Sequence, residues 1–299
     1  MTETVQKQKK REPRDWGIGM VLIYIVMILF ALACAFPLLY ELLLSFASMQ
    51  DYMTAEYLVI PKDFNFENYK YILFQDRIGT AFLISVFVTS AGTAYTMLLN
   101  ALGAYALTKS RMPGRKIFFA FVIITMFFDG GLIPFYLTVR DLKMTNTLWS
   151  LIIPFGVSTF DMILLRNFFS QVSEEMIESC KLDGAGEIRI FFGFVIPLSL
   201  AGIATITLFT IVAKWNDWYW PLIFLTLRDD LFPLALELRN VLMDQQGAGV
   251  VDGVINTDKV FGQGQNAAMI IISIAPILCI YPFLQKFFVK GVMIGSVKS

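Results

Sequence analysis

Long stretches without a single charged residue constrain this chain more than any other feature of its sequence. The first extends from Trp16 to Tyr40, between Asp15 and Glu41. About 20 mostly apolar residues are enough for a helix to cross a hydrocarbon layer about 30 Å thick. With 57% hydrophobic and 16% charged residues among 299, the chain holds more apolar side chains than one soluble core can cover with polar surface. We therefore predict an all-α, polytopic membrane protein.

Six largely charge-free windows, the third interrupted by Asp129 and the fourth by Asp161 and Arg166, predict six membrane-spanning helices in one domain, residues 16–290. The spans are expected at about residues 18–44, 81–107, 117–139, 148–169, 192–214 and 267–287. The other segments are the tails, residues 1–15 and 291–299, the external loops, residues 45–80 and 215–266, and an internal loop, residues 173–190. Pro154 and Gly156 interrupt the fourth window, so a broken helix is expected there.

The placement of Lys and Arg predicts the orientation of these spans. Basic residues gather in both tails, in the loop 109–116 and in the segment after the fourth span, which all fall on one side of a six-span chain. Basic loops are retained in the cytoplasm, so both termini are expected there. Small residues at Ala33-Cys34-Ala35 resemble a cleavage site or a lipoprotein box, but the apolar run continues past them. We interpret this segment as an uncleaved signal anchor.

The composition also excludes several kinds of chemistry. Without His, the chain has no Ser-His-Asp triad, His-ligated metal or imidazole proton shuttle. Three scattered Cys residues predict neither a zinc cluster nor a disulfide framework. The net charge of zero argues against a nucleic-acid-binding protein. No Gly-rich loop ends in Lys-Ser or Lys-Thr, so this chain is not expected to be an ATPase. Together with the absence of His and the scattered Cys, this predicts no cofactor bound by the chain itself.

The internal loop 173–190 has the pattern of two short helices joined at a glycine. Ser173 is expected to cap a first helix whose first turn holds Glu174 and Glu175, which suit the positive end of the helix dipole. Gly184 is expected to end that helix in a left-handed turn. A second helix is expected to begin near Ala185 and to continue into the fifth span. Two helices exposed beside the membrane form a docking surface for another protein.

This loop resembles the EAA loop of ABC-importer permeases. In that family Glu-Ala-Ala is followed, after three residues, by Gly and later by apolar residues and Pro; here Glu178-Ser179-Cys180, Gly184 and Phe194–Pro197 hold those places. Ser179 and Cys180 depart from the two alanines but are also small. Further segments resemble the carbohydrate-importer subgroup and its complex-oligosaccharide branch, namely residues 130–134, 146–149, 165–169, 215–218 and 285–298.

The resemblance implies the type I ABC importer fold and a bacterial cytoplasmic membrane location. It implies a permease subunit of an ATP-driven importer, which moves oligosaccharides into the cell and is not itself an enzyme. The implied partners are a second permease, two ATPase subunits that carry ATP and Mg²⁺, and an extracellular sugar-binding protein or lipoprotein. The residues expected to couple to the ATPase are Glu174, Glu175, Glu178, Ser179, Cys180, Asp183, Gly184 and Ala185.

Two carboxylates inside the predicted spans are candidates for a substrate path, because intramembrane charges are costly and usually functional. Asp129 either accepts hydrogen bonds from sugar hydroxyls or caps the break at Gly130-Gly131. Asp161 either contacts substrate or belongs to a capping box with Ser158. We also expect Asn100, Gly103 and Ala104 to serve helix packing rather than ligand binding.

The segment 215–220 is rich in aromatic residues and forms either a sugar-stacking surface or an interfacial aromatic belt. The full set of path candidates is Asp129, Asp161, Trp215, Asn216, Asp217, Trp218, Tyr219 and Trp220. Since no Lys or Arg is expected deep in a span, the path should favour neutral hydroxylated ligands over anions.

Three other functions fit parts of the sequence. An ABC permease for peptides or another polar solute would have the same loop. An ion-coupled secondary transporter would use Asp129 and Asp161 as ion sites, but would leave the loop 173–190 unexplained, and no internal repeat of the kind such carriers use is visible. A membrane hydrolase would use the same two acids as a dyad, although neither lies in a suitable motif.

Overall fold

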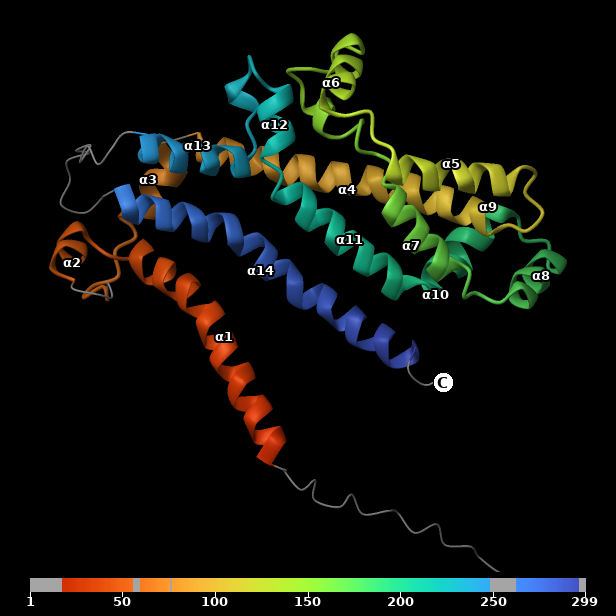
Figure 1. The fold of residues 1–299 in the computed structure, drawn as a ribbon, viewed down its shortest axis with the longest axis horizontal. Helices are drawn as coiled ribbons and strands as arrows, with labels where there is room; N and C mark the ends of the chain where they lie inside the picture. The colour runs from red at the N-terminus through yellow and green to blue at the C-terminus, as the bar shows by residue number, and fades with distance from the viewer. Residues whose placement is uncertain (1–17, 56–59, 76, 248–261, 296–299) are drawn as a thin grey trace, which may run out of the picture.

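The computed structural model describes residues 18–55, 60–75, 77–247 and 262–295, and within these ranges all regular structure is helical (Figure 1). The first half holds α1 (Ile18–Ser45), α2 (Met49–Thr54), α3 (Glu67–Gln75), α4 (Ile78–Thr108), α5 (Arg115–Phe127), α6 (Leu132–Asp141) and a 3₁₀ turn, η1 (Leu148–Leu151). The second half holds α7 (Thr159–Phe169), α8 (Glu174–Leu182), α9 (Glu187–Ile190), a π-helical turn, η2 (Phe191–Val195), α10 (Ile196–Leu198), α11 (Leu200–Trp215), α12 (Tyr219–Phe224), η3 (Asp229–Leu231), α13 (Leu234–Gly247) and α14 (Gly262–Gly295).

Three helices are long and apolar enough to cross a membrane, judged by length and composition: Ile18–Ser45, Ile78–Thr108 and Gly262–Pro282. The number rises to five if each of two sharply bent helix pairs counts as one span. The predicted N-terminal tail, the end of the C-terminal tail and residues 248–261 of the second external loop lie outside the described residues.

Three predicted spans are not continuous helices in the structure. The window 117–139 is divided into α5 and α6, which meet at 114°. Gly131 lies in the break with φ +85°, a backbone conformation that residues with a Cβ rarely adopt. The window 192–214 bends by 83° at Ser199, two residues after Pro197, whose ring cannot donate a helical hydrogen bond.

The fourth window breaks where Pro154 and Gly156 predict a break. Only the 11 residues of α7 are α-helical there, about 16 Å at 1.5 Å per residue, too short to cross a bilayer alone. Asn100 of α4, fully buried, satisfies the broken backbone: its Nδ2 donates to Gly156 O at 3.3 Å, and its Oδ1 accepts from the Ser158 N–H at 3.0 Å. The prediction that Asn100 serves packing is confirmed.

Helix α4 forms the centre of the bundle, with α7 and α11 against it, while α5 packs on α7 and α1 contacts α14. Small residues allow the helices to approach closely. A Cβ at Gly103 would lie 2.8 Å from Cε of Met162, and one at Gly202 would lie 2.2 Å from Cγ of Phe168. Ala104 is fully buried, so the packing role predicted for Gly103 and Ala104 is confirmed.

The bundle has two distinct ends in Figure 1. Helices α8 and α9 lie at one end, together with the loop that joins α4 to α5. Helices α2, α3 and α13 lie at the other end. The basic loop 109–116 and the segment 173–190 therefore share one end of the molecule, as the charge distribution requires.

Candidate functional site

The segment 173–190 folds as its sequence predicts. Ser173 Oγ accepts a hydrogen bond from the Met176 N–H at 3.3 Å and so caps α8. At the other end Gly184 has φ +79°, and the N–H groups of Gly184 and Ala185 donate to Lys181 O and Cys180 O, both at 3.0 Å. These two bonds form a Schellman motif, which satisfies the last carbonyls of the helix.

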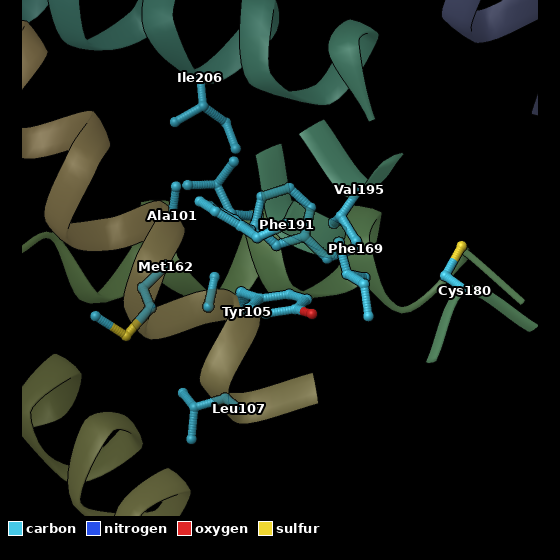
Figure 2. Packing of buried hydrophobic residues seen from close by; sticks show 12 residues of the cluster. Ala101, Tyr105, Leu107, Met162, Phe169, Cys180, Phe191, Val195 and Ile206 are labelled. Atoms are coloured by element: carbon cyan, nitrogen blue, oxygen red, sulfur yellow. The ribbon is translucent and has the colours of Figure 1, made fainter. Parts of the chain in front are cut away.

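The coupling candidates divide into an exposed set and an inner set. The exposed residues are Glu174, Glu175, Glu178, Ser179, Asp183 and Gly184. Cys180 is buried, 8% exposed, at the edge of a cluster with Phe169, Ile190 and Phe191 (Figure 2), and Ala185 is half-buried against the same cluster. The side chain of Cys180 therefore packs α8 against the chain's own core, and its expected part in coupling to the ATPase stays a prediction.

A charged cluster beside α8 was not predicted from the sequence. Glu187 Oε2 accepts from Lys109 Nζ at 2.8 Å and from Tyr105 Oη at 2.7 Å, and its Oε1 accepts from Lys181 Nζ at 2.7 Å. Hydrogen bonds from Lys109 and then Lys181 lower the pKa of Glu187 to about 2, so its carboxylate is ionised at physiological pH. No local pattern reveals this cluster, because its members are up to 82 residues apart.

A cavity of about 1020 Å³ gathers several path candidates from different helices. Its lining includes Asp129, Asp161, Asp217, Tyr219 and Trp220, together with Thr96, Ser158, Phe160, Phe209, Thr210 and Lys214. The volume is at the upper end of ordinary small-molecule sites. Carboxylates, hydroxyls and aromatic faces line one space, a combination that can accept and donate hydrogen bonds and stack on flat apolar faces.

Asp129 and Asp161 each take part in a cap at a helix break and also line the cavity, so each combines the structural and the substrate-path alternative. Asp129 Oδ1 accepts from the Gly131 N–H at 3.1 Å, as a cap at the break, and the residue also lines the cavity. Ser158 Oγ accepts from the Asp161 N–H at 3.3 Å and caps α7. The reciprocal half of the capping box is missing, since the Ser158 N–H donates to Asn100 instead.

The aromatic segment after α11 divides between the cavity and the core. Asp217 Oδ1 accepts from the backbone N–H groups of Tyr219 and Trp220, at 3.1 and 3.2 Å, and so holds the turn from which both residues reach the cavity wall. Trp220 stacks on Phe224 with centroids 5.4 Å apart.

Three path candidates lie outside the cavity lining. Trp215 is buried, and its Nε1–H donates to Ser273 O of α14 at 2.8 Å, so it is a core residue. Asn216 Nδ2 donates to Val212 O on its own helix. The guanidinium of Arg239 lies 4.6 Å from the ring centroid of Trp218. Neighbours on α14 and α13, remote in sequence, decide the role of Trp215 and Trp218.

Lys214, the last residue of the fifth predicted span, is a cavity residue that sequence reasoning missed. It adds a cation to the cavity lining, whereas the expectation from the sequence concerned only the deep part of the spans. Its aliphatic stem crosses α4 at Gly92, where a Cβ would lie 3.0 Å from Lys214 Cδ. Asp161 and Asp217 act on it electrostatically, but it belongs to none of the ion pairs found among the described residues. The glycine-lysine contact joins residues 92 and 214, so no sequence motif marks it.

Comparison with known proteins identifies the family. No family model matches the chain. The polygalacturonan/rhamnogalacturonan transport system permease protein YtcP of Bacillus subtilis (strain 168) is 37% identical over 280 residues, which cover 93% of this chain and 98% of that protein. This chain belongs to the carbohydrate-uptake family of ABC-importer permeases. The resemblance carried by the loop 173–190 is thereby confirmed, and the secondary-transporter and hydrolase alternatives are set aside.

Two further comparisons extend this result. The permease is 26% identical to the diacetylchitobiose uptake system permease protein NgcG of Streptomyces coelicolor, over 91% of this chain and 86% of that one. Its fold matches a crystal structure of a bacterial ABC transporter involved in the import of the acidic polysaccharide alginate, with a TM-score of 0.81 and 28% identity over 92% of this chain and 98% of the other. The predicted all-α ABC importer fold is confirmed.

Proposed function

We propose that the permease passes oligosaccharides through the 1020 Å³ cavity, driven by two ATPase subunits that dock on the exposed face of α8. A second permease completes the pathway, and an extracellular binding protein or lipoprotein delivers the sugar. The observation that carries this proposal is one cavity in which Asp129, Asp161 and Asp217 share walls with Tyr219 and Trp220. Carboxylates accept hydrogen bonds from sugar hydroxyls, and aromatic faces pack on sugar rings.

The position of the charged segments supports a cytoplasmic location for α8 and for both termini. The loop 109–116 and α8 lie at the same end of the bundle, and basic loops face the cytoplasm. ATP and Mg²⁺ would be carried by the ATPase subunits, and this chain would hold no cofactor of its own. Its part in the cycle is mechanical, since it converts movement of α8 into opening and closing of the cavity.

Transport by the complete complex tests this proposal. The permease is purified with its partner permease and ATPase subunits, placed in vesicles and supplied with the binding protein. Uptake of an oligosaccharide should stop when ATP is depleted and should continue when the proton gradient is collapsed. A parallel binding screen of glycans against peptides with the binding protein identifies the solute class. Uptake that persists without ATP, or a binding protein specific for peptides, would contradict the proposal.

Acidic oligosaccharides are a second candidate within this function, because of Lys214. Its ammonium is the cation of the cavity lining, and it can pair with a sugar carboxylate. Asp129 and Asp217 each already use one carboxylate oxygen on backbone N–H groups, so their charge is partly engaged. YtcP is named for polygalacturonan/rhamnogalacturonan transport, and the solved transporter is described as importing the acidic polysaccharide alginate.

We expect Lys214→Met to reduce uptake of an acidic oligosaccharide such as an oligogalacturonide by about tenfold, the effect of losing one charge-assisted hydrogen bond of about 1.4 kcal/mol. Uptake of a neutral oligosaccharide of equal length should change little. Initial uptake rates in vesicles measure both. Lys70→Met, which removes an exposed lysine of α3, serves as the control. Equal losses for the two sugars would assign Lys214 a packing role against Gly92 instead.

A further inference from the structure

Three helices of the permease meet at the side chain of Glu187. Tyr105 lies in the last turn of α4 and Lys109 is the C-cap residue that follows it. Lys181 comes from the last turn of α8, and Glu187 begins α9. The two carboxylate oxygens are divided between the helices. Oε2 accepts from Tyr105 and Lys109, and Oε1 accepts from Lys181. The carboxylate therefore bridges α8 and α4.

Besides this bridge, α8 contacts the rest of the permease through a small apolar face. On its inner face Cys180 is buried and Ile177 is half-buried, while Met176 and Leu182 are exposed. Among the described residues, no other side-chain hydrogen bond or ion pair joins α8 to α4. Apolar contacts of this kind are non-directional. Charge-assisted hydrogen bonds add a directional link.

Helix α4 leads from this bridge to the cavity. Its 31 residues extend about 46 Å, and Val88 and Thr96 of the same helix line the cavity. A displacement of its Lys109 end can therefore reach the cavity wall through one continuous helix. We infer that Glu187 is a positioning residue of the transport cycle, whose carboxylate transmits movement of α8 to α4. This inference rests on the proposed function, because it takes α8 as the docking element of the ATPase.

The solvent exposure of Glu187 and Lys181 indicates whether a substitution should affect folding or transport. The side chains of Glu187 and Lys181 are 52% and 47% exposed, and water screens such pairs strongly. Their loss should hardly affect folding. The Glu187 bridge between α8 and α4 matters only when α8 moves during the transport cycle. A substitution is therefore expected to lower the amount of sugar transported per ATP hydrolysed.

The test is Glu187→Gln in the assembled transporter, with the purified ATPase and partner permease subunits in vesicles. Gln keeps the size of the side chain and removes its charge. We expect the sugar transported per ATP hydrolysed to fall about threefold or more, a change within the range of coupling mutations. The amount of ATPase that copurifies should stay at the wild-type level. Glu67→Gln, which breaks an exposed 2.9 Å pair with Lys70 on α3, is the matched control and should leave the ratio unchanged.

Lys109→Met tests whether Glu187 acts through its bridge to α4 or only through its own charge. Lys109→Met should lower the same ratio, and Lys109→Met combined with Glu187→Gln should lower it no further than the stronger single change, because both remove one link. Additive losses, or an unchanged ratio in both single variants, would overturn the inference. Loss of the ATPase from the purified complex would also overturn it, since Glu187 would then be a docking contact. If the wild-type complex itself shows no ATP-dependent uptake, the proposed function fails first.

Discussion

Gly184→Ala is expected to reduce ATP-driven uptake about tenfold, and Gly184→Pro to abolish it. Gly184 ends α8 with φ +79°, and its N–H donates to Lys181 O at 3.0 Å. A left-handed conformation costs a residue with a Cβ about 1–2 kcal/mol, which is a factor of about 5–30 in the population of the correct turn. Proline cannot reach a positive φ and has no N–H to donate, so the Schellman motif is lost. Uptake and ATPase stimulation by loaded binding protein measure the effect.

Gly186→Ala is the matched control for this prediction. Gly186 lies two residues further along, with φ −72° and ψ 162°, which any residue adopts. A Cβ would meet nothing within 4 Å at either glycine, so crowding does not distinguish them. Uptake by Gly186→Ala should therefore stay within about twofold of the wild type. Wild-type uptake and ATPase stimulation in Gly184→Pro would show that the turn at α8 has no part in coupling.

Gly202→Ala is expected to destabilise the permease by about 1–3 kcal/mol or more, through overpacking between α11 and α7. The new Cβ would lie 2.2 Å from Cγ of Phe168 and 2.4 Å from its Cδ2, distances that real contacts do not show. Either the ring or the whole of α11 must move. Thermal unfolding of the purified protein in detergent should show a lower midpoint, and the yield of folded protein should fall with it.

Gly193→Ala controls for the helix propensity of alanine. A Cβ at Gly193 meets nothing within 4 Å, so this change should be neutral or slightly stabilising. Phe168→Ala should relieve the clash, so Gly202→Ala should cost less in that background than in the wild type. An equal cost in both backgrounds would mean that the α11–α7 contact does not limit the position of Gly202.

The sequence predicts the local elements of the coupling segment well. Ser173 and Gly184 act through hydrogen bonds to residues three to five positions away, so their cap and turn are visible in the pattern of residues. The break at Pro154 and Gly156 is equally local. The family also follows from the sequence, because the loop motif occupies consecutive positions.

The local sequence pattern predicts only some of the residues that line the cavity. Asp129, Asp161 and Asp217 stand out as charges among apolar residues, and all three line the cavity. Trp215 and Tyr219 are both aromatic residues of one short segment, and the sequence does not distinguish their roles. In the structure, Trp215 contacts Ser273 of α14, whereas Tyr219 lines the cavity. The direction of each ring depends on how the helices cross, which a single helical period does not contain.

The sequence by itself determined the membrane setting, the helical class, the family and the turn at Gly184, because each depends on composition or on residues a few positions apart. Only the tertiary structure decided that Lys214 faces the cavity across Gly92, and that Glu187 joins Lys109 to Lys181. The physical reason is distance along the chain. A contact between residues 92 and 214 is created by the packing of α4 against α11, and it leaves no periodic trace in either helix.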